Sequence, residues 1–219
     1  MFDRHAAAYD SRNSFFSLGL DRSWRRKAAA AARLKPGDLA LDLCTGTGKL
    51  ARALLPYVRP TGRVVGIDFS KPMLERARRL EPQVEFLLGD VVALPFADAS
   101  ADAITIGFGY RNLVDRRAGL KEFHRVLRPG GRLVILELPP PPPGPLGALY
   151  RFYLVRVMPR VADWLSRGEE HAYHYLSATV QDFPSPAALV RDLEQAGFRE
   201  VKVRLLSLGI AAIHVGVKP

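Results

Sequence analysis

The chain has a single cysteine, Cys44, among its 219 residues. One thiol excludes an internal disulfide and any metal site built from several cysteines. Apolar runs are also short, and none approaches the roughly 18 residues that a membrane-spanning helix needs. The first residues, MFDRHAAAYDSRN, lack the apolar core of a signal peptide. We therefore expect a cytoplasmic protein and no metal site.

Acidic residues are also few. The chain has 22 of them and 32 lysines and arginines, which gives a net charge of +10. The arginines are spread along helix-like stretches and lack the interleaved aromatic residues of a nucleic-acid groove, so we expect no nucleic-acid partner. The charge is typical of solvated helix faces. It also favours a transient contact with the inner face of a membrane. A homodimer is a further expected arrangement.

Short apolar segments alternate with helical patterns through most of the chain. Strands are predicted at 39–43, 63–67, 84–88, 102–107 and 132–137, and a closing hairpin after 199. Such alternation is typical of an α/β fold, in which helices cover both faces of a mostly parallel, here seven-stranded, sheet. Ligands of such sheets bind at the carboxyl ends of the strands.

The whole chain, 1–219, is predicted to form one domain. Residues 1–35 are predicted to form a helical cap that precedes the first strand. Residues 138–147 contain the run PPPPPGP, which predicts a stiff extended linker. Residues 148–183 are rich in Tyr and Phe and predict a helical insertion beside a substrate.

The segment LALDLCTGTGK, residues 39–49, predicts a buried strand, a glycine turn and a helix that together bind a nucleotide-like ligand. A phosphate-binding loop of the GxxxxGK[ST] type is excluded, because Leu43 and Leu50 stand where glycine and a hydroxyl residue are required. A dinucleotide such as NAD stays open on this loop alone. Gly46 and Gly48 fit its fingerprint, and Asp68 follows about twenty residues later.

The acid before the glycines favours a different ligand. Asp42 would repel a pyrophosphate but attract the ammonium group of a methionine moiety, as in S-adenosylmethionine. Asp68 and Asp90 follow the next two predicted strands. Methionine, ribose and adenine would then meet successive strand ends, and this order favours S-adenosylmethionine over NAD.

The sequence resembles the quinone C-methyltransferases of menaquinone and ubiquinone biosynthesis. LDLCTGTG, VVGIDFSKPML and HRVLRPGGRL are shared by many methyltransferases, whereas FGYRN, YHYLSATVQDFP and GIAAIHVGVKP resemble signatures found chiefly in this group. The resemblance implies a class I, Rossmann-like methyltransferase. It also implies S-adenosylmethionine as cofactor and a prenylated quinol as the substrate, methylated on a ring carbon. Another small molecule or RNA remains the alternative acceptor.

The loop itself predicts Asp42, Gly46 and Gly48 as cofactor-binding residues, and Phe69, next to Asp68, is expected with them. The resemblance implies that Thr47 and Asp68 contact the cofactor, that Asp90 and Val91 border its adenine, and that Gly107 completes the pocket. Three positions depart from the family pattern: Lys49 replaces the usual Asp, Val91 the usual Ala, and Gly107 a common Ser. Because Gly107 has no hydroxyl, any cofactor contact there must come from the backbone.

The residues expected at the acceptor are Arg111 and Asn112, as a polar clamp, and His174, as the preferred general base. A guanidinium would favour the ionised form of a quinol hydroxyl. The alternative for Arg111 is a structural ion pair. Tyr9, Tyr110 and Tyr175 are expected on the substrate side, and other base candidates are Tyr9, Tyr175, His124 and His214.

Overall fold

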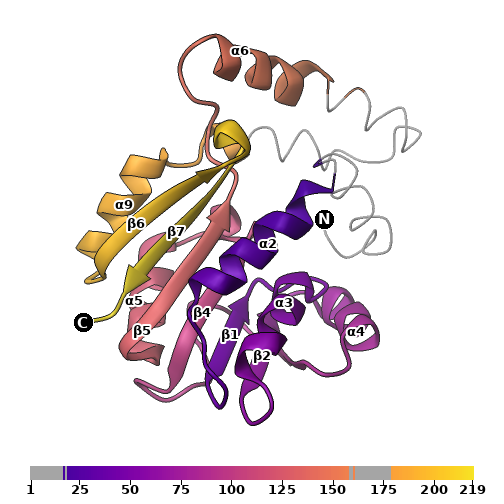
Figure 1. The fold of residues 1–219 in the computed structure, drawn as a ribbon, viewed down its shortest axis with the longest axis vertical. Helices are drawn as coiled ribbons and strands as arrows, with labels where there is room; N and C mark the ends of the chain where they lie inside the picture. Colours follow the sequence, from indigo (N-terminus) through magenta and orange to yellow (C-terminus); the bar gives the residue numbers. More distant parts are fainter. Residues whose placement is uncertain (1–16, 18, 158–159, 161–178) are drawn as a thin grey trace.

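The structure is a computed structural model that describes residues 17, 19–157, 160 and 179–219. A seven-stranded sheet forms its centre, in the order β3-β2-β1-β4-β5-β7-β6 (Figure 1). Neighbouring strands are parallel except for the two pairs that β7 makes with β5 and β6. The strands are β1 (Leu39–Leu43), β2 (Arg63–Asp68), β3 (Glu85–Leu88), β4 (Ala101–Gly107), β5 (Leu127–Glu137), β6 (Arg199–Leu206) and β7 (Ala211–Val217).

The predicted mostly parallel sheet and its closing hairpin are thus confirmed, with one difference in β5. This strand begins at Leu127 and not at 132. Gly130 donates to the Lys218 carbonyl over 2.8 Å, and Lys218 donates to the Gly131 carbonyl over 3.0 Å. The Pro-Gly-Gly of the HRVLRPGGRL motif therefore forms a hydrogen-bonded irregularity within the strand, where the register against β4 shifts.

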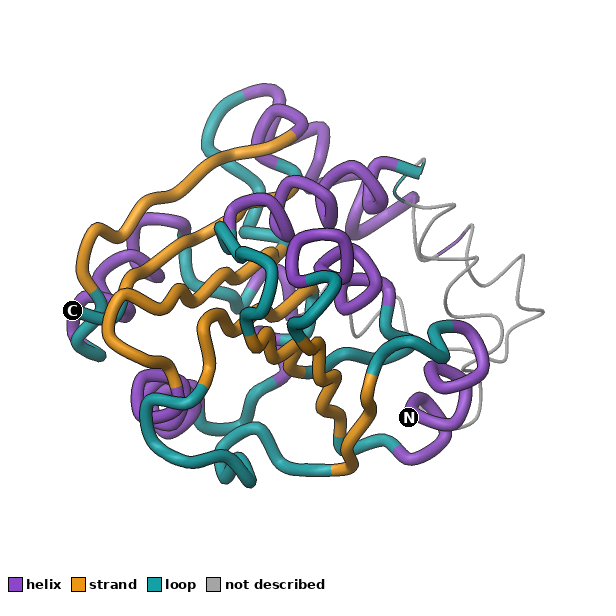
Figure 2. The backbone as a smooth tube through the Cα atoms, turned by 60° about the horizontal axis from the view of Figure 1, so that its bottom comes forward, coloured by secondary structure: helices purple, strands orange, loops and turns teal. Residues whose placement is uncertain are grey.

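Helices cover both faces of the sheet (Figures 1 and 2). On one face lie α2 (Leu20–Ala31), α3 (Lys49–Val58) and α4 (Lys71–Leu80). The other face is covered by α5 (Arg116–Val126) and α9 (Pro186–Gln195). Their apolar side chains form two clusters of buried residues separated by the sheet, as parallel strands require.

Local sequence sets where several helices begin. Ser70, Asp115 and Ser185 accept hydrogen bonds from the first turns of α4, α5 and α9, respectively. Local sequence also sets the end of α9, because Gly197 follows the helix with a φ of 97°. In contrast, α3 begins at Gly48 without a side-chain cap, which leaves its start to the glycine turn after β1.

The proline-rich segment differs from the prediction at its end. Residues 138–144 are irregular, but α6 (Pro145–Phe152) begins inside the expected linker, because proline fits the first turn of a helix. A short π-helical turn, η3 (Tyr153–Val157), continues α6. Together they stand beyond the carboxyl ends of the central strands (Figure 1). Within the described part of the chain, no helix is long and apolar enough to cross a membrane.

The packing of Gly109 against Cys44 gives a test of the turn after β4. Gly109 has an ordinary φ of −112°, but a Cβ built there would lie 2.4 Å from Cys44 Cβ. We expect Gly109→Ala to lower the free energy of unfolding by about 3 kcal/mol through overpacking, measured by urea titration. Gly130→Ala is the control, because that position is open and only its φ of 78° opposes a side chain, at about 1 kcal/mol. Equal losses would contradict the close contact.

Candidate functional site

The carboxyl ends of β2, β1 and β4 lie side by side and form the floor of the candidate site. The register places Asp42 beside Gly66 of β2 and Thr105 of β4. Asp68 pairs with Leu88 at the end of β3. Residues that are far apart in the chain therefore meet at one edge of the sheet, as the alternation of strands and helices predicted.

The turn after β1 adopts left-handed backbone conformations. Cys44, Gly46 and Gly48 have φ values of 51°, 56° and 81°, a region that glycine tolerates best. A Cβ on Gly48 would lie 2.8 Å from the Phe86 ring, whereas no atom of the described residues lies within 4 Å of the corresponding position on Gly46. Gly48 is therefore required for packing, and Gly46 leaves open space for a ligand above the turn.

Asp42 holds this turn together from below. Its carboxylate accepts hydrogen bonds from Thr45 Oγ1 and Thr105 Oγ1, both at 2.7 Å, and from the Ala51 backbone N–H at 3.0 Å. Burial raises the pKa of Asp42 to about 6, opposed by these hydrogen bonds and by the charge of Arg25. Asp42 thus accepts hydrogen bonds from protein donors on both of its oxygens, and its predicted contact with a methionine ammonium stays a prediction.

Asp68 joins the end of β2 to the same turn. Its two carboxylate oxygens accept the backbone N–H groups of Gly46 and Ser70, at 2.8 and 2.9 Å. A carboxylate is also the type of group that accepts a hydrogen bond from a ribose hydroxyl. Asp68 is therefore placed as the sequence predicted, between the glycine turn and the next strand end.

Two apolar side chains stand exposed beside Asp68. Phe69 is 69% exposed, and Leu88, at the end of the neighbouring strand, is 58% exposed. Asp90 is exposed and accepts the Val92 backbone N–H at 3.0 Å, while the Val91 side chain is buried. An apolar surface bordered by an acid suits an adenine ring.

These residues fit S-adenosylmethionine as a group. The open turn, the acid at a ribose position and the exposed apolar surface lie in the order methionine, ribose and adenine along three strand ends. Thr47 is buried within the same turn. The individual contacts assigned from the sequence remain predictions.

The end of β4 closes the other side of the turn. A Cβ on Gly107 would lie 3.0 Å from Leu50 Cδ2 and 3.2 Å from Arg25 Nη1. A serine at this position would therefore press on both neighbours, which gives a physical reason for glycine in this chain. Gly107 leads through Phe108, with a φ of 63°, into a short 3-10 turn, η2 (Tyr110–Asn112).

Tyr110 was expected on the substrate side, but the structure places it in the core. Its side chain is fully buried, and its ring meets that of Phe183 edge-on at 6.2 Å between centroids. Burial raises the pKa of the Tyr110 phenol. The residue lies in the core beneath α5 and α9, because the 3-10 turn directs it inward.

Arg111 takes the alternative role that the sequence left open, a buried ion pair. Its Nη1 lies 2.5 Å from Glu137 Oε1 at the end of β5, with exposed side-chain fractions of 7% and 1%. Nη1 also donates to the Phe108 carbonyl at 2.7 Å, and Glu137 accepts the backbone N–H groups of Arg111 and Leu138. The charge expected to face a quinol oxygen is therefore balanced by Glu137, which the sequence analysis missed. An acid ending the apolar run RLVILE was the available signal, the same one that marked Asp42.

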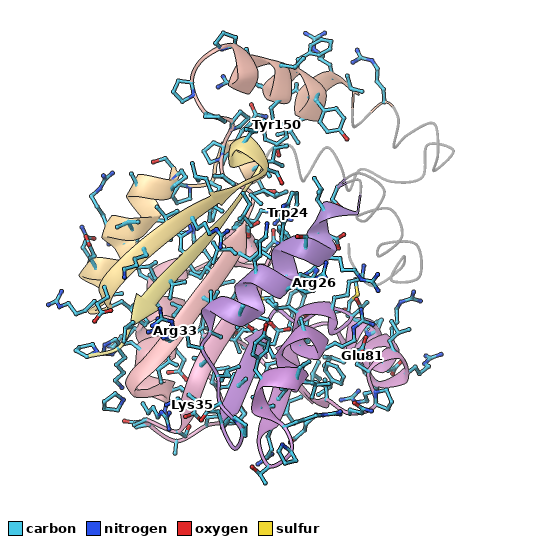
Figure 3. The ribbon with its side chains drawn as sticks, viewed as in Figure 1. Trp24, Arg26, Arg33, Lys35, Glu81 and Tyr150 are labelled. Atoms are coloured by element: carbon cyan, nitrogen blue, oxygen red, sulfur yellow. The ribbon has the colours of Figure 1, made fainter. Side chains whose placement is uncertain are left out.

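Tyr150 of α6 is a second missed residue near Arg111. Burial raises the pKa of its phenol, and the charge of Arg111 opposes that rise, so the two groups interact electrostatically. Figure 3 places Tyr150 between α6 and the strand ends. Neighbouring Tyr153 also has a pKa raised by burial. No local sequence pattern distinguished Tyr150 and Tyr153 from the other tyrosines of the aromatic segment as site candidates.

The histidine candidates divide into two groups. His214 contacts the Pro186 carbonyl at 3.1 Å and His124 packs on Phe198, so both lie on the α9 side of the sheet, away from the open turn. Burial lowers the pKa of both imidazoles. His174, Tyr9 and Tyr175 lie outside the described residues, and their predicted roles are untested.

Asn112 lies in η2 beside Arg111. Among the residues described, no cluster of acidic, His or Cys side chains is arranged for a metal ion.

Comparisons with known proteins match the whole chain. The model of the ubiE/COQ5 methyltransferase family matches residues 1–218. The chain is similar to the demethylmenaquinone methyltransferase of Thermus thermophilus, with 48% identity over 100% of both chains. It is 43% identical to that of Mycobacterium sp. strain KMS, over 100% of this chain and 93% of the relative. A solved S-adenosylmethionine-dependent methyltransferase from Aquifex aeolicus has the same fold, with a TM-score of 0.65, 22% identity and 89% coverage of each chain.

The buried pair of Arg111 and Glu137 generates a stability prediction. Glu137→Ala leaves the Arg111 charge buried without its partner, and we expect the free energy of unfolding to fall by about 3–5 kcal/mol. The double variant Arg111→Met/Glu137→Leu replaces both charges by apolar side chains and should recover most of that loss. Urea titration of the single and double variants gives the coupling energy. Additive losses would show that the pair contributes no coupling.

Proposed function

This chain belongs to the ubiE/COQ5 methyltransferase family, and from that premise we propose that it methylates a ring carbon of a prenylated naphthoquinol, converting demethylmenaquinol to menaquinol. It is an S-adenosylmethionine-dependent enzyme. The proposed acceptor rests on the full-length match, at 48% identity, to a relative named demethylmenaquinone methyltransferase.

Bound S-adenosylmethionine supplies an electrophilic methyl group on its sulfonium. A quinol hydroxyl loses its proton, and the resulting phenolate makes the neighbouring ring carbon nucleophilic. The ring carbon would take the methyl group as the carbon–sulfur bond breaks, and the methylated carbon would then lose its proton. The phenolate oxygen would regain one proton, so the net products would be the methylated quinol, S-adenosylhomocysteine and one proton. Holding the two reactants in line can be worth roughly 7–11 kcal/mol.

Asp68, the glycine turn and the Phe69 surface hold the cofactor in this proposal. These residues would hold the ribose and adenine at one edge of the sheet, next to the end of β4. The fixed backbone of the turn costs little reorganisation on binding, because Asp42 and Asp68 already hold it by hydrogen bonds.

Arg111 and Tyr150 are the groups we place at the quinol oxygen. The Nε of Arg111 is buried and has no hydrogen-bond partner in the part of the chain that the structure describes. A Tyr150 phenol with a raised pKa stays protonated and can donate a hydrogen bond. Because Glu137 balances the guanidinium charge, Arg111 acts as an oriented donor more than as a free cation. Asn112 and His174 retain their predicted roles as clamp and base.

Methyl transfer tests the proposed acceptor. With labelled S-adenosylmethionine and reduced demethylmenaquinone, we expect label in the extracted lipid, and label in bulk RNA instead would overturn the choice. Arg111→Ala should lower the rate roughly 100-fold, the usual effect of losing one donor to a developing oxyanion. Arg117→Ala, at an exposed position on α5, is the matched control and should keep the wild-type rate. Calorimetry with S-adenosylhomocysteine checks that each variant still binds cofactor.

A peripheral contact with an anionic membrane is the second part of the proposal. Leu149, Phe152 and Val155 are exposed along α6 and η3, and Arg151 and Arg156 are exposed beside them. This surface borders an open groove of about 580 Å³ between the proline-rich segment and α6. Exposed apolar residues flanked by arginines suit an anionic lipid surface. The expected homodimer stays a prediction.

Vesicle sedimentation tests the contact through α6. The wild-type chain should sediment with vesicles that contain phosphatidylglycerol and much less with pure phosphatidylcholine. Leu149→Glu/Phe152→Glu should abolish binding, since both apolar anchors are lost. Leu80→Glu, at an exposed position at the end of α4, is the control and should bind as the wild type does. Unchanged binding of the double variant would place the contact elsewhere.

A further inference from the structure

We propose that Arg25 of helix α2 binds the carboxylate at the methionine end of S-adenosylmethionine. The inference rests on the proposed function only in its choice of cofactor, and it does not depend on the acceptor. It assigns a ligand to a residue of the helical cap, which the sequence analysis left without one.

Helix α2 brings Arg25 to the site because its apolar side packs on the sheet. Trp24, Ala28 and Ala29 belong to the buried cluster on this face. Trp24 Nε1 donates to Ser207 Oγ at 3.0 Å, and its ring lies 6.2 Å from that of Phe108. These contacts fix both the position and the rotation of the helix. Figure 3 labels Trp24 beside α2, near the ends of the strands.

The Arg25 guanidinium lies over the ends of β1 and β4. Its central carbon is 4.9 Å from the centroid of the Phe108 ring. A Cβ built on Gly107 would be 3.2 Å from Arg25 Nη1, and the Arg25 charge lowers the pKa of Asp42. The guanidinium therefore occupies the methionine end of the site, opposite the exposed Phe69 surface.

At least one donor of Arg25, its Nε, has no hydrogen-bond partner among the described residues. Its side chain is 15% exposed, its Nε is buried, and that atom makes no hydrogen bond to any described residue. Asp21, one turn earlier, lies 3.6 Å from this Nε, which is an ion-pair distance but too long for a hydrogen bond. Asp21 therefore orients the guanidinium without taking its N–H groups, which match a carboxylate in a bidentate geometry.

The charges around the turn fit a zwitterion. Asp42 lies below the turn with its oxygens bonded to protein donors, and Arg25 lies across the end of β4. A methionine moiety carries an ammonium and a carboxylate on one carbon, so opposite charges on two sides of the turn stabilise both groups. A neutral ribose or adenine would gain little from Arg25.

Binding of two different ligands distinguishes a carboxylate-binding role of Arg25 from a role in packing alone. S-adenosylhomocysteine carries the amino-acid end, whereas 5′-methylthioadenosine lacks it and keeps the adenine, ribose and sulfur. For Arg25→Gln, we expect calorimetry to show a Kd for S-adenosylhomocysteine raised about 10- to 100-fold, the usual loss for a hydrogen bond to a charged group. The Kd for 5′-methylthioadenosine should stay within about twofold. Arg26→Gln, at the exposed neighbouring position, should leave both values unchanged.

Arg25→Lys keeps the charge and serves as the second variant if the glutamine variant does not fold. It should weaken S-adenosylhomocysteine binding selectively, because a lysine cannot make the bidentate contact. Equal weakening of both ligands, or no change for either, would refute the assignment. These measurements need no quinol, so a chain that binds the cofactor but does not methylate demethylmenaquinol would refute the acceptor alone.

Discussion

The buried carboxylate of Asp42 is a hydrogen-bond acceptor shared by three parts of the fold. Its hydrogen bonds reach the turn after β1 through Thr45, the start of α3 through Ala51 and the neighbouring strand β4 through Thr105. Because α3 has no side-chain cap, the same carboxylate also serves an N–H group near the start of that helix. The open turn above it depends on this arrangement.

The rest of the site is placed by close backbone packing around that turn. Gly48 contacts Phe86, and Gly109 contacts Cys44 at a distance that leaves no room for a side chain. The chain after β4 is thereby held beside the turn after β1, which brings Arg25, Gly107 and Arg111 to one edge. Close packing of this kind supports preorganisation, since the groups that meet a ligand are held by neighbours that cannot move apart cheaply.

The amino-acid sequence alone could not show which charged groups at this edge pair with each other. Arg111 was identified from its motif, but the sequence could not decide between a ligand and an ion pair. Glu137 lies 26 positions away and reaches it only because β5 is the neighbour of β4. Tyr150 reaches the same region because α6 follows the proline-rich segment over the strand ends. Tyr110 was misplaced for the opposite reason, since a short 3-10 turn sends adjacent side chains to different sides.

The sequence by itself determined the alternation of strands and helices, the glycine turn with its acids and the family, because these depend on local patterns and short motifs. The helix caps Ser185 and Asp115, seen in the structure, likewise bond only to residues close to them in the chain. The tertiary structure alone decided which charges meet, that Asp42 binds protein donors and that Arg25 of the cap lies over Gly107. Those contacts join residues separated by tens of positions, and their distances follow from strand order and helix packing, which no local pattern specifies.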